Sequence, residues 1–178
     1  MTASPTFRIR RGTPRDAAAL AALAARTFHE TFVEHTAPDD MTRFLAATYG
    51  EAQQRRELED DAIVTLVAEA EGALIGYAQL KSGGEVPNCV PEELPIELAR
   101  FYVDRQWHGG GVAQALMNVV EQEARTAAAR TLWLGVWERN HRAIAFYAKH
   151  GFRRIGAHPF LVGSDLQTDD LMARTLEG

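Results

Sequence analysis

A run of three glycines constrains this chain more than any other feature of its sequence. Gly109, Gly110 and Gly111 follow a strand-like segment, Ile96 to Val103, and apolar residues recur at helical spacing from Val112 onward. A strand, a glycine turn and a helix start in this order make an anion site, because consecutive backbone N–H groups point outward and the helix dipole adds positive potential. The pattern predicts that a phosphorylated molecule binds at this turn.

Strand-like and helix-like segments alternate over the rest of the chain. Amphipathic spacing, caps and a glycine stop predict helices at residues 14–32, 38–49, 51–61, 111–127 and 140–150. Alternation and turn signals predict strands at residues 7–11, 62–69, 74–80, 96–103, 131–137, 152–162 and 168–176, with a hairpin turn at Glu71-Gly72. This order predicts one mixed α/β (α+β) domain that spans residues 1–178.

Composition and charge narrow the compartment and the partners. Hydrophobic residues make up 46% of the 178 residues, enough for one buried core. No apolar run approaches the roughly 20 residues that a transmembrane helix needs, and the single cysteine, Cys89, cannot form an internal disulfide. The formal net charge of -5 disfavours nucleic acid, whose binders carry a basic stripe, and suits a cationic small substrate. We therefore expect a cytoplasmic protein with no membrane and no nucleic-acid partner.

Two common phosphate-binding motifs do not fit the glycine turn. No Lys-Ser or Lys-Thr follows the glycines, so the turn lacks the groups with which a P-loop holds a γ-phosphate or magnesium. No acidic residue follows at the end of a second strand about twenty residues later, as a dinucleotide-binding fingerprint requires. The turn therefore belongs to another class of phosphate site.

A second pattern lies one strand later. Asn140 stands at the predicted start of a helix, and Tyr147 follows two turns later on the same face. Each has an ordinary structural explanation, since asparagine is a common helix cap and an aromatic pair such as Phe146-Tyr147 is commonly part of a core. Their combination with the glycine turn is the more specific signal.

Together the two patterns resemble those of the GCN5-related N-acetyltransferases (GNAT), and the resemblance covers nearly the whole chain. The family pattern Gln/Arg-x-x-Gly-x-Gly/Ala falls on residues 108–113, and the element Asn-x-x-Ala-x-x-Phe-Tyr falls on Asn140, Ala143, Phe146 and Tyr147. His108 departs from the pattern, because it replaces the usual Gln or Arg. The resemblance implies a central, mixed, mostly antiparallel twisted sheet with splayed middle strands and helices on both faces.

The resemblance also implies acetyl-CoA as the cosubstrate. Backbone N–H groups from Gly109 to Ala113 would hold its pyrophosphate, and its pantetheine arm would pair with the exposed backbone of residues 101–103. Because main-chain groups make most of these contacts, binding of acetyl-CoA should survive the change at His108. The implied cosubstrate-binding residues are Phe101, Tyr102, Val103, His108, Gly109, Gly110, Gly111, Val112, Ala113, Asn140, Tyr147 and Lys149.

Acetyl transfer to an amine needs acid and base groups, because only the neutral amine attacks. A primary alkylamine has a pKa near 10.4, so on the order of one molecule in a thousand is neutral at pH 7. Glu97 occupies the position where the family often places its general base, although a glutamate there is also explained as a solvated strand end. Tyr147 is the candidate acid for the leaving thiolate, and the N–H of Phe101 or Tyr102 would stabilise the oxyanion.

The acceptor is expected to bind against the segment between residues 28 and 59. A narrower resemblance, to PaiA-type spermidine/spermine acetyltransferases, rests on residues 134–140 and 156–172 and implies a polyamine acceptor, although Leu166 stands where an acidic residue is expected. Aromatic residues at helical spacing are also explained as core, and acidic runs as solvated faces. The candidate substrate-binding residues are Phe28, Phe32, Tyr49 and Glu97, with Glu30, Glu34, Glu85, Glu92 and Glu93 as possible attractors of a cation.

Other functions remain open at this point. The spacings of His29 and His35 and of His141 and His150 do not place two ligands on one helical face, so no metal is expected. One alternative is a CoA-binding sensor or regulatory protein of the same fold with little turnover. Another is an acetyltransferase for a protein N-terminus, a lysine or another amine. The sequence does not fix the oligomeric state, and a homodimer is one option.

Overall fold

One seven-stranded sheet organises the computed structural model, which describes residues 6–91 and 93–177. Its strand order is β1-β2-β3-β4-β5-β7-β6, and every neighbouring pair is antiparallel except β4 and β5, which run parallel. The strands are β1 (Arg8–Arg11), β2 (Ile63–Ala70), β3 (Ala73–Lys81), β4 (Pro95–Val103), β5 (Thr131–Trp137), β6 (Arg153–Val162) and β7 (Asp165–Thr175).

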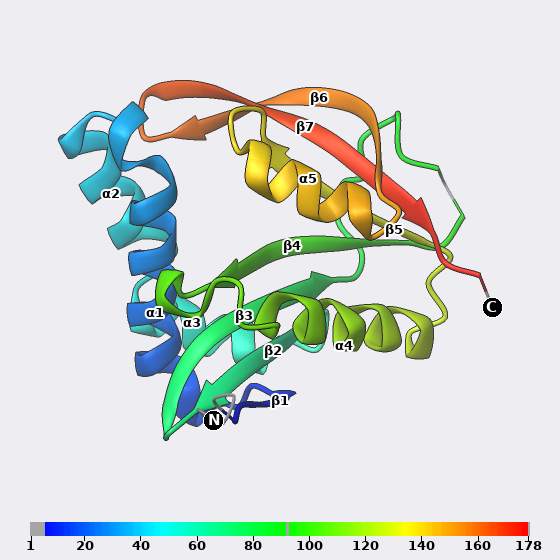
Figure 1. The fold of residues 1–178 in the computed structure, drawn as a ribbon. Helices are drawn as coiled ribbons and strands as arrows, with labels where there is room; N and C mark the ends of the chain where they lie inside the picture. Colours follow the sequence, from blue (N-terminus) through cyan, green and yellow to red (C-terminus); the bar gives the residue numbers. More distant parts are fainter. Residues whose placement is uncertain (1–5, 92, 178) are drawn as a thin grey trace.

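Helices cover both faces of this sheet (Figure 1). Side chains alternate between the faces along each strand, so that Leu66 belongs to the core cluster that contains residues of α4 and α5, whereas the next residue, Val67, belongs to the cluster that contains residues of α1. The α-helices are α1 (Ala17–Phe32), α2 (Pro38–Thr48), α3 (Glu51–Glu59), α4 (Val112–Thr126) and α5 (His141–Lys149), and short 3-10 turns span Pro14–Asp16 (η1), Val33–His35 (η2) and Arg105–Trp107 (η3).

The expected fold class is confirmed, and most element bounds differ from the prediction by only a few residues. The hairpin turn lies where expected, with positive φ at both Glu71 and Gly72. The largest difference is at β7, which begins at Asp165 because Asp165 and Leu166 continue the pairing with β6. Proximity of the two strands after Gly163, rather than local propensity, sets this boundary.

The two halves of the sheet part at its centre. Strands β4 and β5 pair only at residues 95–97 with 131–133, yet each strand continues for several residues beyond that point. A β-bulge at Ala99 interrupts the β3–β4 pairing at the same level, because Gln79 pairs with Arg100 whereas Leu80 pairs with Leu98. Figure 1 shows the consequence, with β1–β4 and β5–β7 as two arms that separate towards α1.

The β6–β7 hairpin folds back onto the helices on the side where β4 and β5 separate. The Asp40 carboxylate accepts hydrogen bonds from the backbone N–H of Ser164 (3.0 Å) and from its hydroxyl (2.9 Å). Gly163 makes this approach feasible, since a Cβ at this position would lie 2.6 Å from Asp40 Oδ1. No helix in residues 6–91 and 93–177 is both long and apolar enough to cross a membrane.

Candidate active site

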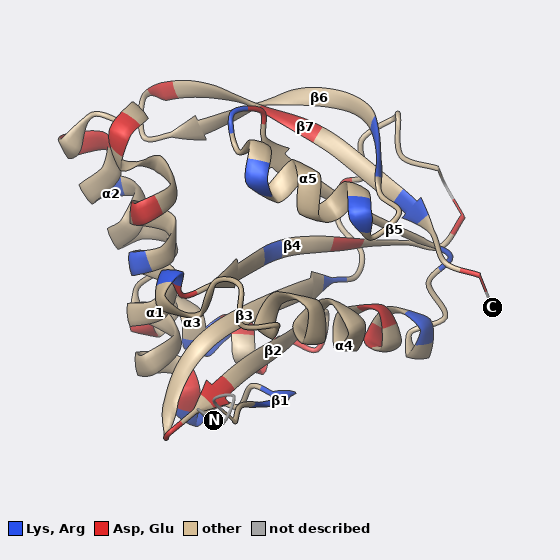
Figure 2. Cartoon of the chain, viewed as in Figure 1, with Lys and Arg blue, Asp and Glu red and all other residues tan. Residues whose placement is uncertain are grey.

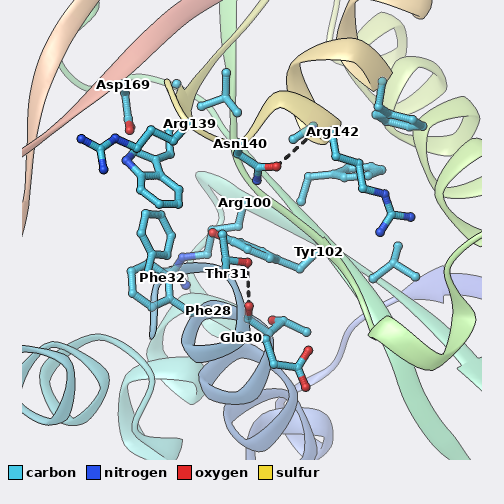
Figure 3. Close-up of a pocket in the computed structure, with 18 of the residues that line it drawn as sticks. Phe28, Glu30, Thr31, Phe32, Arg100, Tyr102, Arg139, Asn140, Arg142 and Asp169 are labelled. Atoms are coloured by element: carbon cyan, nitrogen blue, oxygen red, sulfur yellow. Dashed lines mark hydrogen bonds between the residues drawn. The ribbon is translucent and has the colours of Figure 1, made fainter. Parts of the chain in front are cut away.

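A cleft of about 680 Å³ opens where β4 and β5 part. We call its two sides the α5 end and the α1 end. Figure 3 shows Arg142 at the first, and Asp169, Arg139 and Phe32 on the opposite side. Lining residues at the α5 end include Phe101, Tyr102, Val103, His108, Ala113, Asn140, Arg142 and Tyr147, and those at the α1 end include Phe28, Glu30, Phe32, Glu34, Phe44, Tyr49, Trp137, Arg139, Phe160 and Asp169.

The α5 end contains backbone groups that lack a strand partner. The Asp104 N–H donates to the Ile75 carbonyl on β3 at 2.7 Å, so the alternation of an antiparallel ladder also turns the Tyr102 amide towards β3. The Phe101 and Val103 amides therefore face the gap that β5 leaves. Of the two expected oxyanion donors, this geometry favours Phe101 over Tyr102, whose side chain nevertheless lines the cleft.

The glycine turn presents a row of N–H groups. Gly109 and Gly111 have φ of 79° and 81°, a left-handed conformation that glycine adopts without strain, and Gly111 caps α4. Within the described part of the chain, the amides of Gly109, Gly111, Val112 and Ala113 donate to no acceptor. The turn therefore has the free donors and the helix start that an anion requires.

His108 is committed to protein contacts. Its Nε2 lies 2.8 Å from the Val103 carbonyl, and its Nδ1 is paired with the guanidinium of Arg142. Because an arginine can only donate, Nδ1 accepts from Arg142, and Nε2 is the atom that donates to the Val103 carbonyl. The expected contact of His108 with phosphate would require this arrangement to break. Arg142, on the first turn of α5, is the cation that lies beside the glycine turn, and the motif search missed it.

Helix α5 places Tyr147 in the cleft. The Asn140 side chain caps the helix by accepting a hydrogen bond from the Ala143 N–H at 3.2 Å, as its position predicted (Figure 3). Tyr147 lies two turns later, with 7% of its surface exposed, and its hydroxyl makes no hydrogen bond to any described residue. Burial raises the pKa of Tyr147 above its ordinary value. The phenol therefore keeps its proton at neutral pH and is free to donate it.

Six predicted residues do not line this cleft, and three of them are Gly109, Gly110 and Gly111, whose turn lies between the lining residues His108 and Ala113. Val112 is buried in the core under α4, and Lys149 is exposed on α5. Glu97 lies where β4 and β5 are still paired, and it lines a separate cavity of about 210 Å³ beside Lys81 and Arg100. Burial raises the pKa of Glu97, and the charges of these two neighbours oppose that shift. The structure does not bring Glu97 together with Tyr147.

The predicted acceptor aromatics form one wall of the α1 end. Phe28 stacks on Phe32 with ring centroids 4.4 Å apart, Phe32 lies 4.9 Å from Trp137, and Tyr49 lies 5.5 Å from Phe28. Phe28, Phe32 and Tyr49 are at most 5% exposed and belong to the core on the α1 face. They line the cleft and stabilise the fold at the same time.

The predicted acidic residues separate into two groups. Glu30 and Glu34 are exposed and line the cleft at the α1 end, and Figure 2 shows acidic segments on α1 and α2 facing basic segments on α5. Glu85 and Glu93 lie in the loop before β4 and do not line the cleft, and Glu93 pairs with Arg130 at 4.0 Å. Glu92 lies outside the described residues.

Asp169 on β7 is the carboxylate that sequence reasoning missed. Its side chain is 13% exposed, and its Oδ1 is buried without a hydrogen-bond partner among the described residues. Burial, with a smaller contribution from the neighbouring charge of Asp170, raises the pKa of Asp169 to about 6. The sequence shows only two adjacent aspartates in a strand, and the register with β5 decides which one faces the cleft.

Side chains from distant segments hold the α1 end in place. Arg100 forms an ion pair with Glu57 of α3 at 2.6 Å, and its guanidinium lies 4.9 Å from the centre of the Tyr49 ring. Gln167 accepts a hydrogen bond from the Trp137 indole at 2.9 Å and donates to the His35 carbonyl at 3.3 Å. These links join β4 to α3 and β7 to η2. None of the described His, Cys, Asp and Glu residues forms a group of three that could hold a metal ion.

Comparison with known proteins places this cleft in a family. The family model described as Acetyltransferase (GNAT) family matches residues 23–152, which include the glycine turn and α5. The chain belongs to the GNAT family. The match ends before β6 and β7, so Asp169 lies outside the part of the chain that the family model describes.

Individual GNAT relatives agree with this placement. An uncharacterized N-acetyltransferase of Mycobacterium tuberculosis is 36% identical over 90% of this chain and 98% of its own length. An aminoglycoside N(6')-acetyltransferase type 1 of Stenotrophomonas maltophilia is 30% identical over 74% of this chain and 75% of its own. The PaiA N-acetyltransferase of Thermoplasma acidophilum, solved in complex with coenzyme A, has the same fold with a TM-score of 0.77 at 20% identity, covering 96% of this chain and 99% of that one.

Proposed function

We propose that this protein transfers the acetyl group of acetyl-CoA to a primary amine of a small molecule by direct attack in a ternary complex. One observation carries the proposal. Free backbone donors on β4 and the Tyr147 hydroxyl lie at the α5 end of one cleft, and the unpaired amides of the glycine turn lie between His108 and Ala113, which line the same end. The α1 end of the same cleft leaves space for a second molecule.

The residues present fit acetyl-CoA. The unpaired amides of Gly109, Gly111, Val112 and Ala113 would hold the pyrophosphate, and the Phe101 and Val103 backbone would pair with the pantetheine amides. Arg142 would supply the positive charge that the family pattern assigns to the position of His108. When bound, acetyl-CoA supplies a thioester carbonyl that an amine can attack.

The chain's own groups then have distinct tasks. The Phe101 N–H points into the gap, where it would stabilise negative charge on the carbonyl oxygen. The Tyr147 hydroxyl would donate its proton to the leaving sulfur, a step worth about 10² to 10⁴ in rate. No covalent bond between the acetyl group and the protein is required, because both substrates fit into one open cleft.

We propose a polyamine as the first acceptor to test. Glu30 and Glu34 lie at the rim of the α1 end, where they would attract a second positive charge on the acceptor. The resemblance of residues 134–140 and 156–172 to PaiA-type spermidine/spermine acetyltransferases favours the same choice. The sequence relative that acts on aminoglycosides makes these polycationic amines the next class to test.

Release of free thiol from acetyl-CoA tests the function. Spermidine, spermine, kanamycin and a peptide with a free N-terminus are each added to the purified protein with acetyl-CoA. We expect at least one small amine to accelerate thiol release in proportion to enzyme concentration. Binding of acetyl-CoA without accelerated release by any amine would overturn the enzyme proposal and favour the sensor alternative.

A further inference from the structure

We propose that Asp169 is the catalytic base that takes a proton from the ammonium group of the acceptor. This inference rests on the acetyl transfer proposed above, and it assigns the base to β7 instead of to Glu97 on β4. Asp169 lines the same cleft as Tyr147, whereas Glu97 lines a different cavity.

The register of three strands holds Asp169 at the cleft. Asp169 pairs with Trp137 on β5 and with His158 on β6. Gly135, two residues before Trp137, leaves room for the carboxylate, since a Cβ at this position would lie 3.2 Å from Asp169 Oδ2. Figure 3 shows the carboxylate directed from β7 towards the cleft.

Asp169 lines one cleft together with Tyr102 and Tyr147. Burial is the main cause of the raised pKa of Tyr102, and Tyr147 and Asp169 are both near enough to raise it further. The Tyr102 ring therefore lies within electrostatic reach of the proposed acid and of the proposed base.

The other carboxylates of the site are less suited to accept a proton. Glu57 is occupied by Arg100, Gln53 and Gln79, and Glu30 and Glu34 are exposed at the rim. Asp169 combines a protected position with an Oδ1 that has no partner in the described structure. A base with a pKa near the working pH is the most effective one, and the pKa of about 6 for Asp169 meets this condition.

The proton balance of the reaction is complete with these groups. The ammonium gives one proton to Asp169, which passes it to water, and the neutral nitrogen forms a bond to the thioester carbon. The carbon–sulfur bond breaks, and sulfur takes a proton from Tyr147. The second proton that nitrogen loses as the amide forms replaces the one that Tyr147 gave. The products are the acetylated amine, CoA thiol and one proton in solution.

Several charged groups face Asp169 and enter its pH dependence. His158 Nε2 lies 3.8 Å from Asp169 Oδ2, and Asp170 is adjacent on β7, where it pairs with Arg154 at 2.7 Å. Tyr102 approaches from β4, and Arg139, Glu34 and His35 line the same end of the cleft. His158 is the imidazole nearest to this carboxylate, so it is tested separately.

The test compares Asp169→Asn with the wild type across pH 5–9, using spermidine and the weakly basic trifluoroethylamine as acceptors. We expect kcat/KM for spermidine to fall about 100-fold or more. The decline of wild-type kcat/KM below about pH 6 should disappear in the variant. The loss should be much smaller for trifluoroethylamine, because this amine is already neutral at pH 8 and needs no base.

Asp170→Asn is the matched control, since it makes the same change at the next residue outside the cleft, and His158→Gln tests the neighbouring imidazole. Both control variants should keep the decline of kcat/KM at low pH and lose less than about 5-fold in kcat/KM. If the wild type is active and the Asp169→Asn variant still shows the decline of kcat/KM at low pH, the assignment of the base is overturned. An equal loss of activity with both amines would overturn it as well. A wild type with no amine-dependent turnover would instead overturn the proposed function.

Discussion

The two ends of the cleft are built from different parts of the chain. The α5 end consists mainly of backbone amides that belong to one continuous stretch from β4 to α4, with α5 beside it. The α1 end consists of side chains from α1, α2, β4, β5, β6 and β7, held by contacts such as those of Gln167 and Asp40. The first end depends on local conformation and the second on the register of distant segments.

This difference indicates how strongly amino-acid substitutions can change the binding properties of each end. Backbone donors are insensitive to most substitutions, so we expect the α5 end to bind the same cosubstrate in many sequences and to tolerate His108 in place of Gln or Arg. Side-chain contacts change with each substitution, so the α1 end can select a different acceptor. The predictions below are ordered from the largest expected effect to the smallest.

Tyr147→Phe removes the proposed proton donor of the α5 end. We expect kcat to fall about 100-fold, while the affinity for CoA changes less than about 2-fold, because the backbone contacts remain. Steady-state kinetics and calorimetric titration with CoA measure the two quantities. Unchanged turnover would show that another group protonates the leaving sulfur.

Arg142→Ala removes the cation beside the glycine turn. We expect the affinity for CoA to fall roughly 5- to 10-fold, the range for losing one exposed, charge-assisted hydrogen bond, with little change in kcat. Lys149→Ala is the matched control on the same helix, and it should leave the affinity unchanged because Lys149 lies outside the cleft. Equal losses in both variants would mean that helix α5 acts only through its general positive charge.

Asp169→Asn should stabilise the protein at high pH although it removes activity. Folding raises the pKa of Asp169 from its ordinary 3.8 to about 6, so the ionised carboxylate destabilises the folded state above pH 6 and has no such effect below pH 4. We expect the free energy of unfolding to increase by about 1–2 kcal/mol at pH 8 and not at pH 4. Urea denaturation at both pH values measures this, and an equal gain at both would contradict the burial of a charge.

Glu30→Gln and Glu34→Gln should have the smallest effects. Each removes an exposed charge at the rim, so we expect KM for spermidine to rise about 2- to 3-fold at low ionic strength and the effect to disappear in high salt. Glu93→Gln, in the loop before β4, should change nothing. A polyamine KM that is insensitive to all three would remove the support for a polycationic acceptor.

The same contrast explains what the sequence could reveal. The glycine turn, the Asn140 cap and the position of Tyr147 were predictable because each depends on neighbours within one or two turns of chain. Asp169 and Arg142 were not, because strand register selects Asp169 rather than Asp170 and the packing of α5 beside η3 joins Arg142 to His108. The position of Glu97 also depends on tertiary structure, since pairing of β4 with β5 still closes the sheet at that level.

An amide-resolved NMR titration with CoA tests the division of the cleft most directly. We predict large shifts for the amides of Phe101, Val103 and residues 109–113, and small shifts for Glu30, Glu34 and Asp169. Addition of an acceptor amine should then shift the second group. Shifts centred on the α1 end, or on the cavity beside Glu97, with the glycine turn unaffected, would contradict the proposed cosubstrate site.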